Sequence, residues 1–391
     1  MRIVFVNRYF WPETVLVNEI SRWAANAGHK VTVLTGQPDY NPEADHPSRV
    51  KSQVWDGVRI QCVMPLHAKG RGVVRNIINL LFVFAAFFKI LLGPPCDVVW
   101  TTSIPPIIQP LLLRLATRVR GAKLIYYPQD IYPEIALVSG IMNPGFASRL
   151  LRKLDGWVLE KADRVITISE DMKQILIERG ANPSRTSVIR SFSPYSPSSK
   201  PCVEPGIRPL RFLFSGNLGR FQNLDLIIDA FAGISPNLAE LHFLGEGREK
   251  ARLQKKVAEQ NIKNVFFLPG TDPMTAQDIS RSYHAGIVSL SPEIFNYAYP
   301  AKTYTYLAAG LPLFAVIEDK SELVNVITTH KIGQTVDVFA TVSEISAAIQ
   351  SFEGNHAVYG KNVMKHTHLH DPKTARDMWQ DMFSDLQRKT T

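Results

Sequence analysis

The chain has 391 residues, which is longer than a domain with a single hydrophobic core usually is, so we expect two domains. Hydrophobic residues make up 45% of it and no long low-complexity tract is present, which excludes a disordered or fibrous protein. The net charge of +9 lies in the first half: residues 1–205 hold 25 Lys and Arg against 16 Asp and Glu, and residues 206–391 hold 19 of each. The first half should therefore favour an anionic partner.

A membrane surface or a phosphorylated lipid fits this charge better than nucleic acid, because no nucleic-acid motif or basic-aromatic stripe is present. The three cysteines, Cys62, Cys96 and Cys202, have no metal-ligand spacing and are odd in number. No metal site is predicted from them, and a reducing, cytoplasmic compartment is expected. No secretory signal is expected either, because Met1–Val6 runs straight into a predicted buried strand.

The first half alternates short apolar strands with helical stretches, which favours a parallel sheet covered on both faces. A helix is predicted over Leu16–Asn26 and ends before Gly28. The predicted strands are Ile3–Val6, Val31–Thr35, Val58–Val63, Asp97–Thr101, Lys123–Tyr127 and Arg164–Ser169.

A Pro- and Ser-rich segment interrupts this pattern, and we place a linker at 196–209 between domains at 1–195 and 210–372. The alternation then restarts, with a helix over Leu224–Phe231 and a C-terminal helix over Thr374–Leu386 within 373–391. Ligands bind at the carboxyl ends of strands in such sheets. The predicted strands are Leu210–Ser215, Glu240–Leu244, Val265–Leu268, Gly286–Leu290 and Leu313–Ile317.

The most hydrophobic stretch, Ile77–Leu92, is interrupted by Asn79 and Lys89 and is short for a transmembrane helix. One interpretation is a buried crossover helix. The other is a helix lying in a membrane interface, assisted by basic residues. The two interpretations are compatible if one face of the helix packs on the protein and the other inserts into the membrane surface. The basic residues are Lys69, Arg71, Arg75, Arg114, Arg118, Arg120 and Lys123.

Two glycine turns and one lysine predict a site for a nucleoside diphosphate. Gly216-Asn217-Leu-Gly219-Arg220 and Gly245-Glu246-Gly247 each follow a strand and precede a helix, where backbone N–H groups meet a phosphate. Neither has the third glycine of the dinucleotide fingerprint. Lys302 enters a helix ending at Gly310, and we expect Lys302 and Arg220 to neutralise a departing diphosphate.

Asp130 follows a predicted strand end, and a carboxylate there can accept the proton of an attacking hydroxyl. The alternative is a helix N-cap, because a helical stretch follows. Glu134, after Pro133, is expected to be structural. His366, His368 and His370 alternate in the tail, where a solvated segment is favoured over an adventitious metal site.

Several short motifs, in this order, resemble the retaining, GT-B-fold glycosyltransferase family 4, and more closely its bacterial branch that builds surface polysaccharides and O-antigens. The motifs are Tyr9–Glu13, Gly28–Thr35, Thr102–Pro106, Asp130–Glu134, Ala162–Ser169, Phe214–Gly219, Gly245–Gly247 and Pro300–Pro312.

The resemblance implies a GT-B fold, two Rossmann-like doubly wound α/β domains facing a central cleft. It implies transfer of a hexose or N-acetylhexosamine with retention, from a nucleotide-diphosphate sugar bound by the C-terminal domain, and no obligatory metal ion or cofactor. The acceptor, a lipid-linked saccharide, would bind the N-terminal domain at the inner face of a bacterial membrane. The C-terminal helix would cross back onto the N-terminal domain.

Catalytic roles are assigned to Asp130, Glu293, Lys302 and Arg220. Acceptor binding is assigned to the first loop and its neighbours, and donor binding to the C-terminal domain. The acceptor residues are Arg8, Glu13, Asn18 and Ser103. The donor residues are Gly216, Asn217, Gly219, Gly245, Glu246, Gly247, Tyr299, Pro300, Thr303, Tyr304 and Thr305.

The chain departs from the family's pattern at several of these positions. Of the two glutamates spaced eight apart, the first falls at Tyr297, with Glu293 just upstream, and the second at Thr305. Asn217 and Gln222 stand where many members have Arg and Lys, and Val15–Val17 replaces a glycine pair. A sugar-nucleotide 2-epimerase and a sugar-nucleotide-binding scaffold without catalysis therefore remain as alternatives.

Overall fold

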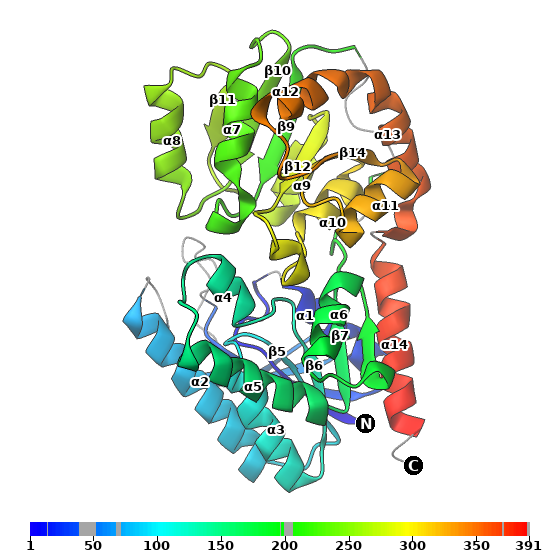
Figure 1. Ribbon diagram of the computed structural model, residues 1–391. Coiled ribbons are helices and arrows are strands. Elements are labelled where there is room, and N and C mark those ends of the chain that lie inside the picture. The colour runs from blue at the N-terminus through cyan, green and yellow to red at the C-terminus, as the bar shows by residue number, and fades with distance from the viewer. Residues whose placement is uncertain are drawn as a thin grey trace. The chain divides into compact units, whose positions relative to one another are not determined.

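A computed structural model describes residues 1–13, 15–38, 52–67, 72–195, 197–198, 206–369 and 371–388. Lys69, Arg71, Cys202, His370 and most of the predicted linker lie outside these residues. The chain divides into two compact units, the first formed by Met1–Arg190 with Ala375–Thr391 and the second by Ser191–Thr374 (Figure 1). Each unit is built on one sheet.

The first unit contains an eight-stranded sheet in the order β3-β4-β2-β1-β5-β6-β7-β8. All neighbours are parallel except β3 and β4, which pair antiparallel. The central strands are buried apolar runs, as expected for a parallel sheet covered on both faces. The strands are β1 (Arg2–Val6), β2 (Lys30–Gly36), β3 (Ser52–Trp55), β4 (Val58–Met64), β5 (Val98–Thr102), β6 (Lys123–Tyr127), β7 (Arg164–Thr167) and β8 (Thr186–Val188).

The helices of the first unit connect successive parallel strands. α2 links β4 to β5 and packs mainly against α3, which in turn contacts α5 (Figure 1). The helices are α1 (Leu16–Asn26), α2 (Val73–Leu92), α3 (Ile108–Arg120), α4 (Glu134–Val138), α5 (Phe146–Lys161) and α6 (Glu170–Glu178).

The last helix, α14 (Pro372–Arg388), packs on the first unit although it follows the second in sequence. Trp379 is buried on it, with its ring centroid 5.3 Å from Tyr127 of β6 and 6.1 Å from Trp100 of β5. Lys123 donates a hydrogen bond of 3.0 Å to the carbonyl of Leu386. α14, red in Figure 1, therefore completes the core of the first unit.

The second unit contains a six-stranded parallel sheet in the order β11-β10-β9-β12-β13-β14. Numbered from its first strand, this is the 3-2-1-4-5-6 order of doubly wound nucleotide-binding folds, which bind ligands where the order reverses. That point lies between β9 and β12. The strands are β9 (Leu210–Ser215), β10 (Ala239–Leu244), β11 (Val265–Leu268), β12 (Ala285–Ser289), β13 (Leu313–Val316) and β14 (Gly333–Val336).

Phenylalanines from β9, β13 and the turn after α12 form the core beneath this sheet. The Phe212 ring lies 5.5 Å from both Phe314 and Phe352, which fixes α12 against the strands. The helices are α7 (Leu224–Ala232), α8 (Lys250–Glu259), α9 (Pro273–Ser280), α10 (Lys302–Ala309), α11 (Glu322–His330), α12 (Val342–Ser351) and α13 (Glu353–Lys365).

Candidate functional site

The two glycine turns of the second unit are packed against each other. Gly216 and Gly245 follow β9 and β10, and both have φ in the left-handed region, at +110° and +148°. A Cβ on Gly245 would lie 2.1 Å from the carbonyl oxygen of Gly216, and one on Gly247 2.3 Å from that of Leu218. The turns continue the ladder of the two strands, because the Leu218 N–H bonds the Glu246 carbonyl at 2.9 Å. The glycines are therefore required for the backbones to meet.

Helix α10 is fixed to the carboxyl end of this sheet by Tyr306. Its hydroxyl accepts a hydrogen bond from the Ser215 N–H at 2.6 Å and donates one to the Leu213 carbonyl at 3.1 Å. The ring lies over Gly286 of β12, where a Cβ would be 2.3 Å from it. α10 therefore begins near the switch point between β9 and β12. The role of Tyr306 could not be predicted from the sequence, because it depends on tertiary contacts of the hydroxyl.

Lys302, the first residue of α10, has a buried ammonium group. Its Nζ lies 3.0 Å from the ring centroid of Phe214 and, among the described residues, has no hydrogen-bond partner. Burial lowers the pKa of this amine well below its ordinary value. An anion that binds beside a buried amine stabilises its protonated form and so raises its pKa.

Two hydroxyls at the same edge of the sheet share this property. Thr303 Oγ1, in the first turn of α10, and Ser289 Oγ, on the last residue of β12, are buried without a hydrogen-bond partner among the described residues. Buried polar atoms in native proteins are nearly always paired. Lys302, Thr303 and Ser289 thus offer three buried polar atoms that no other described residue uses.

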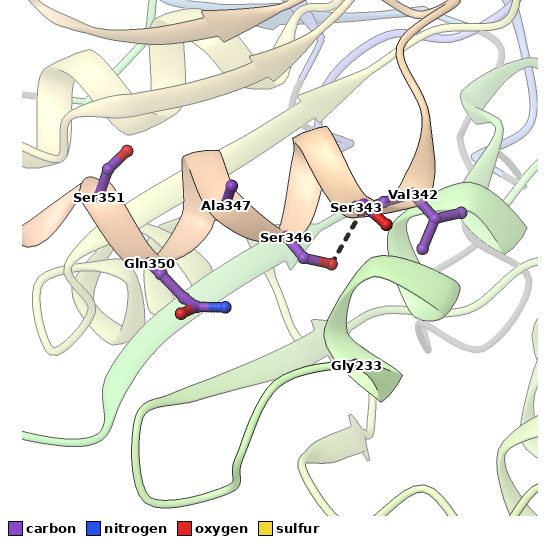
Figure 2. A pocket seen from close by; sticks show the side chains of 7 residues that line it. All are labelled: Gly233, Val342, Ser343, Ser346, Ala347, Gln350 and Ser351. Atoms are coloured by element: carbon purple, nitrogen blue, oxygen red, sulfur yellow. Dashed lines mark hydrogen bonds between the residues drawn. The ribbon is translucent and has the colours of Figure 1, made fainter.

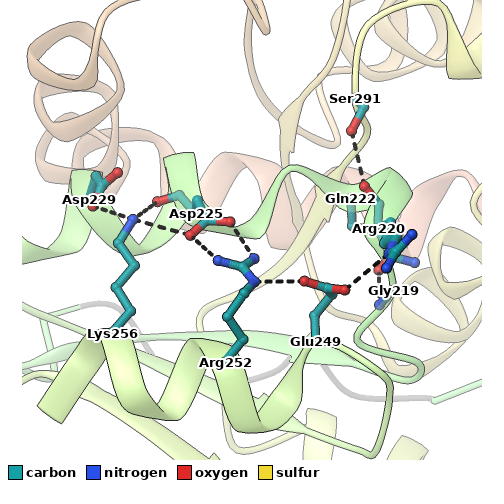
Figure 3. Close-up of polar contacts among 9 residues, drawn as sticks. All are labelled: Gly219, Arg220, Gln222, Asp225, Asp229, Glu249, Arg252, Lys256 and Ser291. Carbon is teal, nitrogen blue, oxygen red and sulfur yellow. Dashed lines mark hydrogen bonds and ion pairs between the residues drawn. The ribbon is translucent and has the colours of Figure 1, made fainter. Parts of the chain in front are cut away.

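Arg220 belongs to a surface network that fixes its position (Figure 3). Its Nε lies 3.4 Å from Glu249, and Arg252 also binds Glu249, at 2.7 Å, while making two bonds of 2.9 and 2.6 Å to Asp225. The hydrogen bond from Arg252 lowers the pKa of Glu249, which stays a carboxylate. The Arg220 side chain is 48% exposed, so a phosphate could compete with Glu249 for it.

The other predicted donor residues lie near the start of α10 or in the turns. Tyr299 stacks on Tyr304 with ring centroids 5.5 Å apart, and Thr305 is half-buried on α10. Glu293 is exposed with φ +67°, and its N–H donates a hydrogen bond of 2.6 Å to Glu318. Glu318, absent from the sequence-based set, thus holds the backbone of the Glu293 turn. Asn217 is exposed and Gly219 bonds Gln222 at 2.7 Å.

The predicted acceptor residues of the first unit are all buried: Arg8, Glu13, Asn18 and Ser103. Arg8 donates a hydrogen bond of 2.9 Å to the Gln37 carbonyl and fits because Gly36 has no side chain in its way. Asn18 bonds the Glu13 carbonyl at 2.7 Å and accepts from the Trp11 N–H at 3.2 Å. Arg8 and Asn18 thereby hold the loop after β1, and acceptor contact by these four residues stays a prediction.

A polar network that the sequence analysis missed lies at the switch point of the first sheet. Asn7, directly after β1, accepts a hydrogen bond of 2.8 Å from Thr102 at the end of β5. Gln109 of α3 donates to Thr101 at 2.9 Å. The signal was present, since Asn7 is polar and follows an apolar strand.

Asp130 lies beyond the end of β6, and no hydrogen bond or ion pair to its carboxyl occurs among the described residues. Burial raises its pKa to about 6. The N-cap alternative is wrong, because α4 begins at Glu134 with Pro133 as its N-cap. Asp130 is therefore a carboxylate with an acceptor oxygen to spare and a pKa suited to proton transfer near neutrality.

Glu134 is occupied by a buried ion-pair cluster. Arg179, 2% exposed, bridges Glu134 and Asp155 and donates a 2.7 Å hydrogen bond to each of Asp155 and the Tyr132 carbonyl. Tyr126 donates to Asp155 at 3.1 Å. This cluster attaches the segment that contains Asp130 to the end of α6.

A separate shallow pocket lies between α12 and the end of α7 (Figure 2). α7 ends toward the amino edge of the sheet, away from the glycine turns. Ser346 already donates to the Ala230 and Val342 carbonyls at 2.7 and 2.9 Å. This pocket offers no reactive group. No cluster of three His, Cys, Asp or Glu side chains able to hold a metal ion occurs in the described part of the chain.

Comparisons with known proteins agree with this architecture. Residues 14–191 match the model of the glycosyl transferase 4-like domain. The chain is 27% identical over 232 residues to the probable glycosyltransferase WbjE of Pseudomonas aeruginosa, covering 57% of each chain. It is 23% identical over 273 residues to the putative colanic acid biosynthesis glycosyl transferase WcaI of Escherichia coli, covering 64% of this chain and 66% of WcaI. The matches thus span less than two thirds of either relative.

Solved structures of GT-B proteins superpose on nearly the whole chain. The sucrose-phosphate synthase of Thermosynechococcus elongatus has a TM-score of 0.76 at 16% identity, with 99% of both chains covered. WaaG, a glycosyltransferase involved in lipopolysaccharide biosynthesis, has 0.66 at 15%, covering 97% of this chain and 99% of its own. HepE of Anabaena, in complex with UDP-glucose, has 0.66 at 13%, covering 98% and 100%. These likenesses establish the GT-B fold.

Proposed function

We propose that the chain is a member of glycosyltransferase family 4 and that it transfers a sugar, with retention, from a nucleoside-diphosphate sugar to a saccharide acceptor. One observation carries the donor assignment: the buried side-chain amine of Lys302 has no hydrogen-bond partner among the described residues and lies at the start of α10, on the carboxyl edge of a 3-2-1-4-5-6 sheet. The structural neighbour HepE was solved with UDP-glucose, which supports a donor of this class.

In this proposal Lys302, Thr303 and the glycine turns hold the diphosphate, with Arg220 beside them. The bond between the anomeric carbon and the diphosphate oxygen breaks, and the acceptor hydroxyl oxygen forms its bond to that carbon on the same face of the sugar. Lys302 and Arg220 stabilise the charge that develops on the diphosphate. The Asp130 carboxylate accepts the hydroxyl proton, and its raised pKa of about 6 favours that transfer. No metal ion or cofactor is needed for these steps.

For the acceptor we propose a lipid-linked saccharide met at the inner face of a bacterial membrane. The excess of positive charge in residues 1–205 supports this acceptor. The names of two similar proteins also support it, since WaaG is involved in lipopolysaccharide biosynthesis and WcaI is a putative glycosyl transferase of colanic acid biosynthesis. The first unit would bind the acceptor and the second the donor.

A transfer assay tests the proposal. Radiolabelled UDP-, GDP- and ADP-sugars are incubated, without metal, with the protein and lipid-linked saccharides extracted from bacteria. We expect one donor to label the lipid fraction, with the anomeric configuration retained by NMR. Asp130→Asn should abolish labelling while donor binding persists.

Donor binding by the wild type without labelling of any acceptor would favour the non-catalytic scaffold. Interconversion of the donor into its 2-epimer would favour the epimerase. Labelling by Asp130→Asn at the wild-type rate would remove Asp130 from the reaction.

A further inference from the structure

The outer face of α2 is an exposed apolar surface. Eight large apolar side chains on this helix are between 41% and 77% exposed. Several follow one another at helical spacing, since Ile77, Leu81, Phe84 and Phe88 differ by four, three and four positions. The eight are Val73, Val74, Ile77, Leu80, Leu81, Phe84, Phe88 and Leu92. A contiguous patch of this kind marks an interaction surface.

The opposite face of α2 is buried in the first unit. Ile78, Phe82, Ala86 and Ile90 are nearly inaccessible to solvent along the length of the helix, which packs on α3 and β4. α2 is long and apolar enough to cross a membrane. It is, however, a crossover between β4 and β5, two parallel strands of one sheet. Since that sheet cannot enter hydrocarbon, α2 can lie in a membrane surface but cannot span it.

Basic residues outnumber acidic ones in and near α2. Residues 72–120 contain five Lys and Arg and a single acidic residue, Asp97, which is paired with Arg2. Arg59 and Lys89 line a groove between β4 and α2 together with Phe88 and Cys62. In the described part of the chain, neither basic residue has an acidic partner. Their charges are thus available to an anionic surface.

We propose that the outer face of α2 is a membrane-docking surface, lying in the headgroup region of an anionic bilayer with Phe84 and Phe88 among the acyl chains and Lys89 and Arg59 against lipid phosphates. Exposed apolar residues continue onto α3 at Leu115 and Val119, beside Arg118. The surface deepens the proposed lipid-linked acceptor and rests on it for its biological role. Docking itself requires neither donor nor turnover.

Vesicle co-sedimentation of the full chain tests this surface. Vesicles of phosphatidylcholine with 30% phosphatidylglycerol are compared with phosphatidylcholine alone. We expect binding to the anionic vesicles that weakens in 0.5 M NaCl. The triple variant Leu81→Gln, Phe84→Gln, Phe88→Gln should lower the partition coefficient by tenfold or more. Arg59→Gln with Lys89→Gln should lower it only on anionic vesicles.

A matched control replaces three exposed apolar residues of the second unit, as Met274→Gln, Phe339→Gln and Val358→Gln, and should bind as the wild type does. An unchanged melting temperature and unchanged nucleotide binding show that the variants are folded. Equal partition of the α2 triple variant and the wild type would overturn the proposal. So would a wild-type dimer in solution that the α2 variant dissociates, because a second copy would then cover the face. A wild-type protein that binds vesicles but transfers no sugar would count against the proposed function alone.

Discussion

Lys302 and Asp130 are ionisable groups whose pKa values are shifted by burial and which have no partner of opposite charge among the described residues. Lys302 was predicted because a lysine stands where a helix begins after a strand, but its contact with Phe214 depends on tertiary packing and could not be predicted. For Asp130 the sequence left two interpretations open, and Pro133 as the N-cap of α4 removes one. The partner of Arg220, Glu249, lies 29 residues away and gives no local signal.

Asp130→Asn should make the protein more stable at pH 8 but not at pH 4. With a folded pKa of about 6 against an ordinary 3.8, the folded state retains the proton between these values while the unfolded chain loses it. The free energy of unfolding therefore falls as pH rises from 4 to 6. Removing the charge should restore stability above pH 6, by up to about 3 kcal/mol at pH 8.

Urea denaturation of both proteins at pH 4, 6 and 8 measures this difference, with Asp163→Asn as the control carboxylate. An equal gain at all three pH values would show that ionisation of Asp130 is not its cause.

The glycine turns after β9 and β10 are the elements that shape the donor site. Their position was predictable because each follows an apolar strand, and Lys123–Tyr127, Leu210–Ser215 and Val265–Leu268 have the strand limits that the sequence indicated. β3, β8 and β14 were missed, because each is a short, partly polar edge strand defined by its neighbour. That the two turns touch could not be predicted from either motif alone.

Gly247→Ala should destabilise the second unit by about 2 kcal/mol or more, because its Cβ would lie 2.3 Å from the Leu218 carbonyl oxygen. Gly354→Ala is the matched control: it lies in α13 with no atom within 4 Å of the added Cβ, and should raise stability by about 0.5–1 kcal/mol. Differential scanning calorimetry measures both. A Gly247→Ala protein as stable as the wild type would mean that the two turns can separate without cost.

At the scale of the whole molecule, the chain passes through one sheet unit, then the other, and returns to the first. The sequence predicts divisions after residues 195, 209 and 372, whereas the compact units divide after Arg190 and after Thr374. Ser198, one of the described residues of the predicted linker, contacts the second unit, since its N–H bonds the Ala308 carbonyl at 2.7 Å. α14 reads as an amphipathic helix, and its attachment through Trp379 fits the return that the family resemblance implied.

Trp379→Ala should destabilise the first unit by about 3–5 kcal/mol, because the ring is buried against Trp100 and Tyr127. Met378→Ala, on the exposed side of α14, should change stability by less than about 0.5 kcal/mol. In calorimetry, Trp379→Ala should lower the transition of the first unit and leave the nucleotide-stabilised transition in place. A shift of both transitions by the same amount would show that the two units unfold as one.

Calorimetric titration of the wild type and Lys302→Met with UDP, GDP and ADP, without metal at pH 8.5, tests the central claim most directly. We predict that one nucleotide binds the wild type with uptake of a proton, seen as a heat that depends on the buffer, because the diphosphate restores the lowered pKa of Lys302. Lys302→Met, which keeps the side-chain volume, should bind about 10- to 100-fold more weakly without that uptake. Equal affinity in both proteins, or no binding of any nucleotide to the wild type, would contradict the donor site.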